Sequence, residues 1–200
     1  KGNYIEMGKQ FMSFYDKNYP KMLKIHKTYP LEKSQKYKNR DNGDITSVKT
    51  ISNFKKTVEK SKKYADLVTA DGGFEWKDEN YQEQEAFQLI FGEMIAALRV
   101  QEKKGSFVLK LFETFTTVSL KMIYMLSSFY EECYIYKPYF SRESNSEKYL
   151  ICKKFKYSQD KKLNSKIEIL EEKLSKMSNN EFVIDIFPEL KLPDKFVKNF

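Results

Sequence analysis

The chain is short of metal-binding residues and of long apolar runs. Its 200 residues include one histidine, His26, and two cysteines, Cys133 and Cys152. These are too few for a histidine-rich metal centre or a disulfide framework, so we expect no metal site. Both cysteines fall in predicted strands, which favours reduced core thiols in an intracellular protein. No run of about 18 apolar residues occurs, so we expect no transmembrane helix and no membrane partner.

Positive charge is concentrated in the first third of the chain. Residues 1–63 contain 16 Lys/Arg and 6 Asp/Glu, a net charge of +10, whereas the other 137 residues contain 20 basic and 22 acidic groups, a net charge of −2. Such a basic block is typical of proteins that bind nucleic acid or another anionic surface. A solvated, lysine-rich face in a chain of biased composition would have the same charge, so charge alone leaves both interpretations open.

Hydrophobic periodicity predicts alternating strands and helices in the middle of the chain. The predicted strands are residues 64–70, 106–112, 132–137 and 147–154, and the predicted helices are residues 46–60, 79–102, 114–130 and 160–177. The last two strands are joined without a helix, so they must pair antiparallel. These elements predict an α/β fold with a mostly parallel sheet and one reversed strand near an edge. Residues 1–31 are predicted to contain one further helix.

Three charged side chains lie in or beside these predicted strands. Asp71 follows the first strand, Lys110 interrupts the second, and Glu147 precedes the last. Charged groups at the ends of buried strands are costly unless they are paired or used, and ligands bind at the carboxyl ends of parallel strands. We therefore expect a Lys–Asp–Glu constellation that acts on a hydroxyl group. A turn aspartate and a solvated lysine on an edge strand are the simpler alternatives.

Three sequence segments resemble motifs of the FtsJ-like ribose 2′-O-methyltransferases. They are ADGG at 70–73, KGSFVLKLF at 104–112 and KPYFSRESNSEKYLICKK at 137–154, and the resemblance covers about residues 42–155. Within that family the chain is most similar to the cap-specific mRNA enzymes and to the branch of the large DNA viruses of poxvirus and asfarvirus type. The resemblance implies a Rossmann-like class I methyltransferase sheet, mostly parallel with one reversed C-terminal strand, and with helices on both faces.

The resemblance also implies roles for individual residues. It implies that Asp71, Lys110 and Glu147 are the catalytic residues. Lys110 would take the proton of the ribose hydroxyl, and the two carboxylates would orient it. A lysine can do this only if burial or a nearby cation destabilises its charged form. The implied cofactor is S-adenosyl-L-methionine, and the residues that would bind it are Asp44, Ile45, Asp71 and Gly72.

The last motif is implied to contact RNA. Its candidate substrate-binding residues are Ser141, Arg142, Asn145 and Ser146. The neighbouring aromatic residues Tyr139 and Phe140 could stack on a base, or could simply pack within the loop. The expected partner is RNA, with capped mRNA first, and a protein of the capping or transcription machinery is a further candidate. We expect an intracellular location, in the cytoplasm rather than the nucleus, or in a viral factory or virion if the protein is viral.

One feature of the family cannot be placed. No GxGxG or PGG sequence precedes Asp44, so the glycine-rich cofactor loop and the family's first catalytic lysine are not recognisable. Either the chain is the later part of the domain, without its N-terminal strand, or the cofactor pocket is degenerate. We therefore assign residues 1–155 to an incomplete methyltransferase domain and residues 156–200 to a helical and extended C-terminal extension packed on it.

The preferred function at this point is 2′-O-methylation of the first nucleotides of capped mRNA. A non-catalytic RNA-binding or scaffold module on a degenerate methyltransferase fold is one alternative, and 2′-O-methylation of ribosomal RNA is another. The missing glycine motif favours the scaffold, whereas retention of Asp71, Lys110 and Glu147 favours an enzyme.

Overall fold

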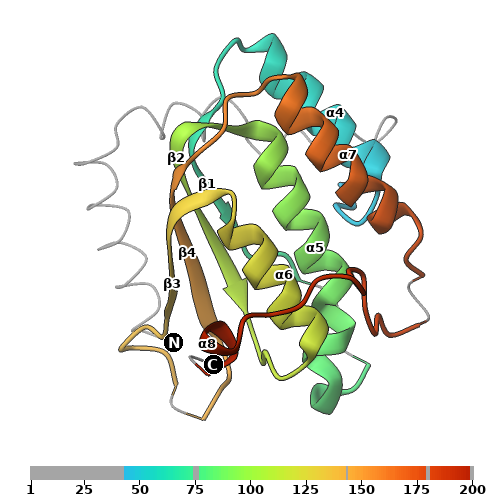
Figure 1. Cartoon of the computed structure of the whole chain (residues 1–200), viewed down its shortest axis with the longest axis vertical. Helices are drawn as coiled ribbons and strands as arrows, with labels where there is room; N and C mark the ends of the chain where they lie inside the picture. Colours follow the sequence, from blue (N-terminus) through green and yellow to red (C-terminus); the bar gives the residue numbers. More distant parts are fainter. Residues whose placement is uncertain (1–42, 74–76, 143, 179–180, 199–200) are drawn as a thin grey trace. The chain divides into compact units, whose positions relative to one another are not determined.

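The computed structural model describes residues 43–73, 77–142, 144–178 and 181–198 (Figure 1). The helix expected within residues 1–31, His26 and most of the basic block lie outside the described residues. The strands are β1 (Ala65–Ala70), β2 (Gln101–Leu111), β3 (Tyr130–Tyr136) and β4 (Lys148–Phe155). The helices are α4 (Val48–Lys60), the 3-10 turn η2 (Glu79–Tyr81), α5 (Gln82–Val100), α6 (Thr117–Ser127), α7 (Lys161–Ser175) and α8 (Asp194–Val197).

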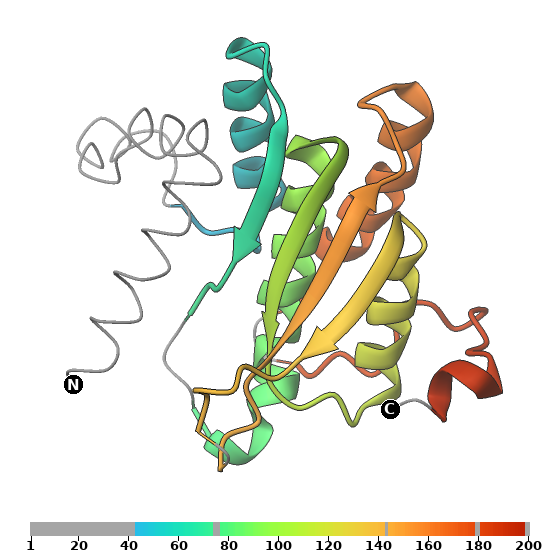
Figure 2. The ribbon, with the colours of Figure 1, turned by 90° about the vertical axis from the view of Figure 1, so that its left-hand side faces the viewer.

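The four strands form one sheet in the order β1-β2-β4-β3 (Figure 2). Strands β1 and β2 are parallel, and β4 is antiparallel to both β2 and β3. Three strands therefore run in one direction, and the reversed strand β4 lies next to an edge. This confirms the predicted mixed sheet.

The helices of the described part lie on one face of this sheet (Figures 1 and 2). Helices α5 and α6 contact the strands, while α4 and α7 pack on α5. From β1 to β2 and from β2 to β3 the chain steps the same way along the sheet, and right-handed crossovers that step the same way put their helices on the same face. We expected helices on both faces. Helices on the second face require a step in the opposite direction, and the described residues contain none.

The core lies between the sheet and α5. On β2 the side chains of Phe107, Leu109 and Leu111 are buried toward the helices, whereas Val108 and Lys110 alternate with them and are only partly buried. Helix α5 is buried around most of its circumference because the sheet lies on one side of it and α4 and α7 on the other. The sheet therefore has an apolar face that builds the core and a second face on which Lys110 lies.

Strand β2 begins earlier than the sequence indicated. The sequence predicts a helix over 79–102 that Gly105 follows and a strand over 106–112, but β2 starts at Gln101 and contains Gly105. The pairing with β1 shifts there, with Ala65 opposite Gln101 and Leu67 opposite Ser106. A Cβ at Gly105 would lie 2.8 Å from the carbonyl oxygen of Glu102, so glycine permits the close approach of backbone at this irregularity.

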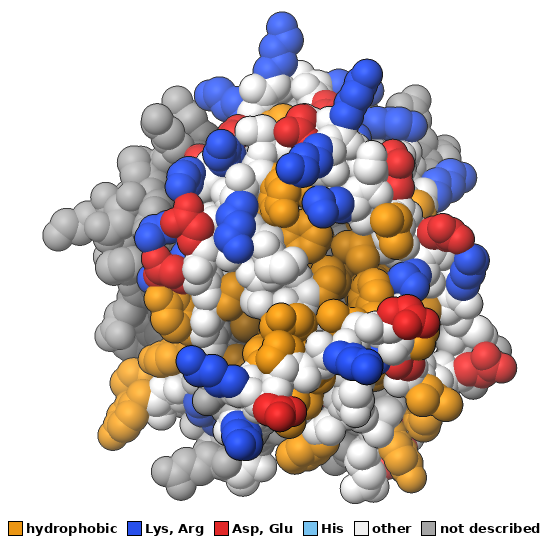
Figure 3. Space-filling view, viewed as in Figure 1, with side chains coloured by type: hydrophobic (Ala, Val, Ile, Leu, Met, Phe, Trp, Pro, Cys, Tyr) orange, Lys and Arg blue, Asp and Glu red, His pale blue; other side chains and the backbone are white. Residues whose placement is uncertain are grey.

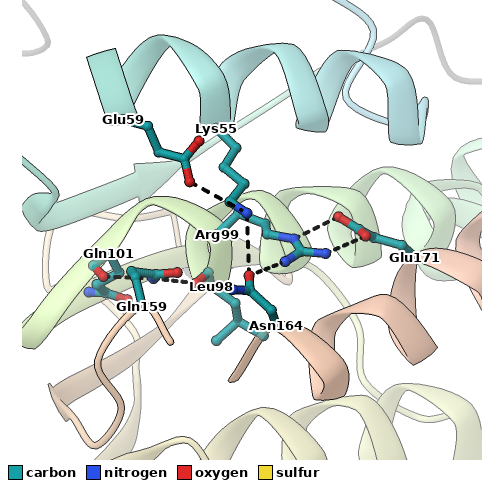
Figure 4. Close-up of polar contacts among 8 residues, drawn as sticks. All are labelled: Lys55, Glu59, Leu98, Arg99, Gln101, Gln159, Asn164 and Glu171. Atoms are coloured by element: carbon teal, nitrogen blue, oxygen red, sulfur yellow. Dashed lines mark hydrogen bonds and ion pairs between the residues drawn. The ribbon is translucent and has the colours of Figure 1, made fainter. Parts of the chain in front are cut away.

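The predicted amphipathic helix at 160–177 is confirmed as α7. Its buried residues are Leu163, Ile167, Leu170 and Leu174. The buried guanidinium of Arg99 on α5 donates a bidentate hydrogen-bond pair to Glu171 and another bond to Asn164 Oδ1 at 2.6 Å (Figure 4). Lys55 of α4 donates to the same Asn164 oxygen at 3.3 Å. These contacts join α4, α5 and α7.

Two smaller expectations have different outcomes. Both cysteines are free thiols, and Cys152 is buried opposite the half-buried Cys133 on β3, as expected for core residues. The spacing of Ile51, Phe54 and Val58 predicts one apolar stripe on α4, but Phe54 is 41% exposed whereas Ile51 is buried. Within the described residues, none of the helices combines the length and the apolar character that a membrane span needs.

Candidate active site

Lys110 and Asp71 form an ion pair at the carboxyl end of β1. Ala70 lies opposite Leu109 in the parallel pairing, which places Asp71 beside Lys110. The Nζ atom of Lys110 lies 3.0 Å from Oδ1 of Asp71. The lysine side chain is 21% exposed and also lies over the ring of Phe112, at 5.5 Å from its centroid. Since β2 lies between β1 and β4, the alternative of a solvated lysine on an edge strand is excluded.

Glu147 approaches this pair through Tyr149. Tyr149 on β4 is the register partner of Lys110 on β2, and its hydroxyl donates to Oε1 of Glu147 at 2.6 Å. Burial raises the pKa of Tyr149, and the bond to Glu147 and the charges of Glu147 and Asp71 raise it further. The phenol therefore remains a donor at neutral pH. Among the described residues, no ion pair joins Lys110 directly to Glu147. Tyr149 was part of the recognised motif, but sequence reasoning gave it no role.

Asn145 connects the loop between β3 and β4 to Glu147. Its Nδ2 donates to Oε2 of Glu147 at 3.4 Å, and its Oδ1 accepts from the hydroxyl of Ser141 at 3.1 Å. The ammonium of Lys137 donates to both oxygens of Asn145, at 2.6 and 2.5 Å. The backbone carbonyl of Arg142 accepts from the Asn145 N–H at 3.2 Å. The loop is thus held by its own polar side chains next to the Glu147 carboxylate.

The remaining loop side chains differ in exposure. Arg142 is exposed, and Ser146 is partly buried between Asn145 and Glu147. The rings of Tyr139 and Phe140 are exposed and lie edge to face, with their centroids 5.4 Å apart. An exposed guanidinium beside two exposed rings can contact a phosphate and stack on a base.

A cavity of about 950 Å³ lies on the helical side of the end of β1. All four predicted cofactor residues line it: Asp44, Ile45, Asp71 and Gly72. Other lining residues come from α5, between Gln84 and Ala97, and from the segment that follows α7. The volume is within the range of pockets that hold a cofactor-sized molecule.

The turn that carries Asp44 is fixed by its own side chain and by a glycine on α5. Oδ1 of Asp44 accepts from the backbone N–H of Thr46 at 2.9 Å and from its hydroxyl at 2.6 Å. A Cβ at Gly92 would lie 2.3 Å from the carbonyl oxygen of Ile45, so only glycine lets the turn pack directly on α5. Sequence reasoning missed Gly92, because its importance depends on how the turn and the helix pack.

Glu93 is a second residue that sequence reasoning missed. Its Oε1 accepts the backbone N–H of Gly72 at 2.6 Å and so fixes the loop after Asp71. Burial raises the pKa of Glu93, the Gly72 N–H lowers it, and the charge of Asp71 raises it, with a net upward shift. A Cβ at Gly72 would lie 2.7 Å from the same oxygen, which explains why glycine suits this position.

The cavity is lined by more acidic than basic side chains. Its carboxylates are Asp44, Asp71, Glu85, Glu93 and Glu181, and its lysine is Lys77. A lining with this excess of negative charge suits a ligand that carries positive charge, as the sulfonium and ammonium groups of S-adenosylmethionine do. Within the described residues, no group of three or more His, Cys, Asp or Glu side chains could hold a metal ion.

The described lysines of the basic block are mostly exposed. Figure 3 shows Lys and Arg side chains over the upper part of this face, where α4 and α7 lie. The exposed lysines on and just after α4 are Lys49, Lys56, Lys60, Lys62 and Lys63. Their exposure fits either interpretation of the charge, a solvated face or a surface that binds a polyanion. The rest of the block lies outside the described residues.

The family model and the most similar relatives indicate the same family of methyltransferases. The model of the FtsJ-like methyltransferases matches residues 21–155, a range that contains every predicted site residue. The chain is 35% identical over 135 residues to cap-specific mRNA (nucleoside-2′-O-)-methyltransferase 2 of Drosophila melanogaster, which covers 66% of this chain and 19% of the relative.

Two further relatives are named cap-specific mRNA (nucleoside-2′-O-)-methyltransferase 1. The protein of Trypanosoma cruzi is 42% identical over 88 residues, covering 43% of this chain and 24% of the relative. The human protein is 36% identical over 121 residues, covering 59% of this chain and 14% of the relative. The chain thus spans a quarter or less of the length of these relatives.

Proposed function

Because the chain belongs to the FtsJ-like methyltransferase family, we propose that it is an S-adenosylmethionine-dependent RNA ribose 2′-O-methyltransferase acting on the first nucleotides of capped mRNA. The observation that carries this proposal is the contact between Lys110 and Asp71, 3.0 Å long, beside the cavity that Asp71 also lines. The names of the relatives support capped mRNA rather than ribosomal RNA as the substrate.

The cavity supports the assignment of the cofactor. S-Adenosylmethionine, when bound, supplies a methyl group on a positively charged sulfur. Asp44 and Asp71 line the cavity at the turn before α4 and at the end of β1, so either carboxylate can bind a hydroxyl or a cationic group of the cofactor. Gly72 also lines the cavity and presents backbone there, and the bond from its N–H to Glu93 fixes that backbone.

Lys110 is the residue that we assign to the ribose hydroxyl. When neutral, its Nζ would accept a hydrogen bond from the 2′-hydroxyl and take the proton that leaves the oxygen, and such a general base typically contributes about 10²–10⁴-fold to the rate. Asp71 favours the charged lysine, so the neutral form would depend on burial of the site by bound ligands and on the positive charge of the methyl donor. Asp71 keeps the lysine at the end of the strand. Glu147 acts through Tyr149, which lies opposite Lys110 and donates to the glutamate.

The loop between β3 and β4 is the part that we assign to RNA. The bonds of Asn145 to Ser141 and Glu147 tie the loop to the lysine site, so a nucleotide bound by the loop would have its ribose close to Lys110. Exposed Arg142 suits a phosphate, and exposed Tyr139 and Phe140 suit the faces of bases. We extend the proposal to an intracellular, cytoplasmic protein that works with other mRNA-capping proteins.

The substrate assignment is tested by transfer of labelled methyl to short RNAs of one sequence. The chain is mixed with labelled S-adenosylmethionine and with a capped RNA, an uncapped RNA, or a capped RNA whose first nucleotides carry 2′-deoxyribose. We expect label only in the capped RNA that keeps its 2′-hydroxyls. Equal labelling of the deoxy substrate would contradict ribose methylation, and equal labelling of the uncapped RNA would contradict cap specificity. Binding of capped RNA without any transfer would support the scaffold alternative.

A further inference from the structure

The segment after α7 lines the cavity although it lies beyond the part of the chain that matches the family. The family match ends at residue 155, yet Ser178, Glu181, Phe182 and Val183 all contribute to the cavity. From there the chain crosses α6 before it ends near α8 (Figure 1). We call the described residues 178 and 181–187 the tail. The tail therefore forms one wall of the cavity, and this wall lies outside the part of the chain that matches the family.

Phe182 presents an aromatic ring at this wall. Its side chain is 52% exposed although it lines the cavity. Its ring lies 5.6 Å from that of Tyr81, at an interplanar angle of 30°, so Tyr81 supports it from one side. An exposed ring at a cavity, backed by a second ring, is a surface on which a flat aromatic ligand can stack. Val183 beside it packs against the core.

The tail is anchored just beyond this wall. The buried ammonium of Lys121 on α6 donates to Oδ2 of Asp185 at 2.7 Å and to the backbone carbonyl of Phe187 at 2.8 Å. Ile186, between them, is buried, and Lys173 of α7 lies over the ring of Phe187 at 4.9 Å from its centroid. Asp185 is only three residues from Phe182, so the anchor keeps the ring at the cavity.

We propose that the tail is part of the methyl-donor site and that Phe182 stacks on the purine ring of the donor. This inference rests on the proposed function, because it takes the cavity to be the cofactor pocket. The ligand fragment that Phe182 recognises is the adenosine part, which the donor shares with its product S-adenosylhomocysteine. Phe182 is thus a binding residue outside the recognised motifs.

Calorimetric titration of the whole chain with S-adenosylhomocysteine, and separately with adenosine, tests the inference. We expect Phe182→Ala to weaken both ligands by the same factor, about tenfold, since stacking of a base on an aromatic ring is worth about 1–3 kcal/mol. Phe182→Tyr keeps a ring and should bind like the wild type, whereas Phe182→Leu keeps only apolar contact and should behave like Phe182→Ala. Ile184→Ala is the matched control, because this side chain in the same tail is 88% exposed.

The outcomes separate the two proposals. If the wild type binds S-adenosylhomocysteine and Phe182→Ala binds it equally well, the tail inference is wrong and the proposed function stands. If Ile184→Ala loses as much affinity as Phe182→Ala, the effect is a general disturbance of the tail and stacking is refuted. If the wild type binds neither ligand, both the inference and the proposed cofactor fail.

Discussion

At the scale of single residues, the site depends on two carboxylates, Asp71 and Glu93, at the loop that follows β1. Glu93 accepts the N–H of Gly72, while Asp71 one residue earlier faces Lys110. The backbone bond lets Glu93 be buried close to a second carboxylate, but it does not offset burial fully, since the pKa of Glu93 remains raised. Glu93 is therefore a group whose ionisation opposes folding.

The first prediction concerns the pH dependence that follows from Glu93. The pKa of Glu93 in the folded state is above the ordinary value of 4.5. Its protonated form therefore contributes fully to the free energy of unfolding when the pH is below 4.5, and this contribution is lost as the pH rises through the raised pKa. Glu93→Gln keeps an acceptor for the Gly72 N–H and removes the charge. We expect the variant to lack this loss, and at pH 7 to be at least as stable as the wild type in urea unfolding.

A charge-matched control makes this prediction specific. Glu168→Gln removes the same charge from an exposed position on α7 and should leave the pH profile of unfolding unchanged. If Glu93→Gln shows the same loss of unfolding free energy between pH 4 and pH 8 as the wild type, Glu93 is not the titrating group.

Residue types at strand ends were enough to select Asp71, Lys110 and Glu147 from the sequence, because charges in apolar segments are conspicuous. The structure pairs the first two directly, and it joins Glu147 to Tyr149 instead. That difference could not be predicted, since the position of Tyr149 opposite Lys110 depends on the register between β2 and β4. The roles of Glu93 and Gly92 could not be predicted for a related reason, because they arise only from contacts between α5 and the loops packed on it.

At the scale of elements, α7 is attached to the domain by a buried polar contact as well as by its apolar stripe. Arg99 is 5% exposed and makes three side-chain hydrogen bonds, two of them to Glu171 and one to Asn164 (Figure 4). Helical periodicity predicted the apolar stripe, but Arg99 lies in a segment that resembles an ordinary helix end. Its burial follows from the packing of α7, which sequence alone does not show.

The second prediction is that Arg99→Met will strongly destabilise the fold. Removing one partner of a buried ion pair leaves the other charge unpaired, which typically costs about 3–5 kcal/mol of unfolding free energy. The double variant Arg99→Met with Glu171→Leu removes both charges and should recover most of that loss. Urea unfolding of the two single variants and the double variant measures this. A double variant no more stable than Arg99→Met would mean that the pair is not the main contribution of Arg99.

The sequence also did not predict the direction in which the chain steps from β1 to β2 and from β2 to β3. The order of elements predicted a mostly parallel sheet with a reversed strand, and the structure has that sheet. It did not predict that α5 and α6 share one face, because the face is set by the direction in which the chain steps between strands. The described part is therefore a sheet with one helical face and a second face on which Lys110 and Tyr149 lie.

At the scale of the whole molecule, charge is distributed unevenly between the first third and the rest. Residues 1–63 have a net charge of +10, and the cavity is lined by five carboxylates and one lysine. These two properties predict opposite preferences, with an anionic polymer attracted to the basic block and a cationic small molecule to the cavity. The two ligands of the proposed reaction should consequently respond differently to salt.

The third prediction is a steep salt dependence of RNA affinity. If six basic residues contact phosphates, affinity for single-stranded RNA should fall about 300-fold between 50 and 200 mM salt, because bound counterions are released on binding. Fluorescence anisotropy with a short labelled RNA measures the slope. The affinity of S-adenosylhomocysteine, titrated under the same conditions, should change far less. A nearly flat slope for RNA would show that the basic block does not bind it.

The central claim is that Lys110, held by Asp71, acts on a ribose hydroxyl, and methyl transfer by strand-matched variants tests it most directly. Single-turnover transfer of labelled methyl to capped RNA should be measured for the wild type, for Lys110→Ala, and for Lys104→Ala, which removes an exposed lysine from the same strand. We predict that Lys110→Ala loses about 10²–10⁴-fold in rate while Lys104→Ala stays near the wild type. Wild-type transfer by Lys110→Ala, or no transfer by the wild type itself, would contradict the account.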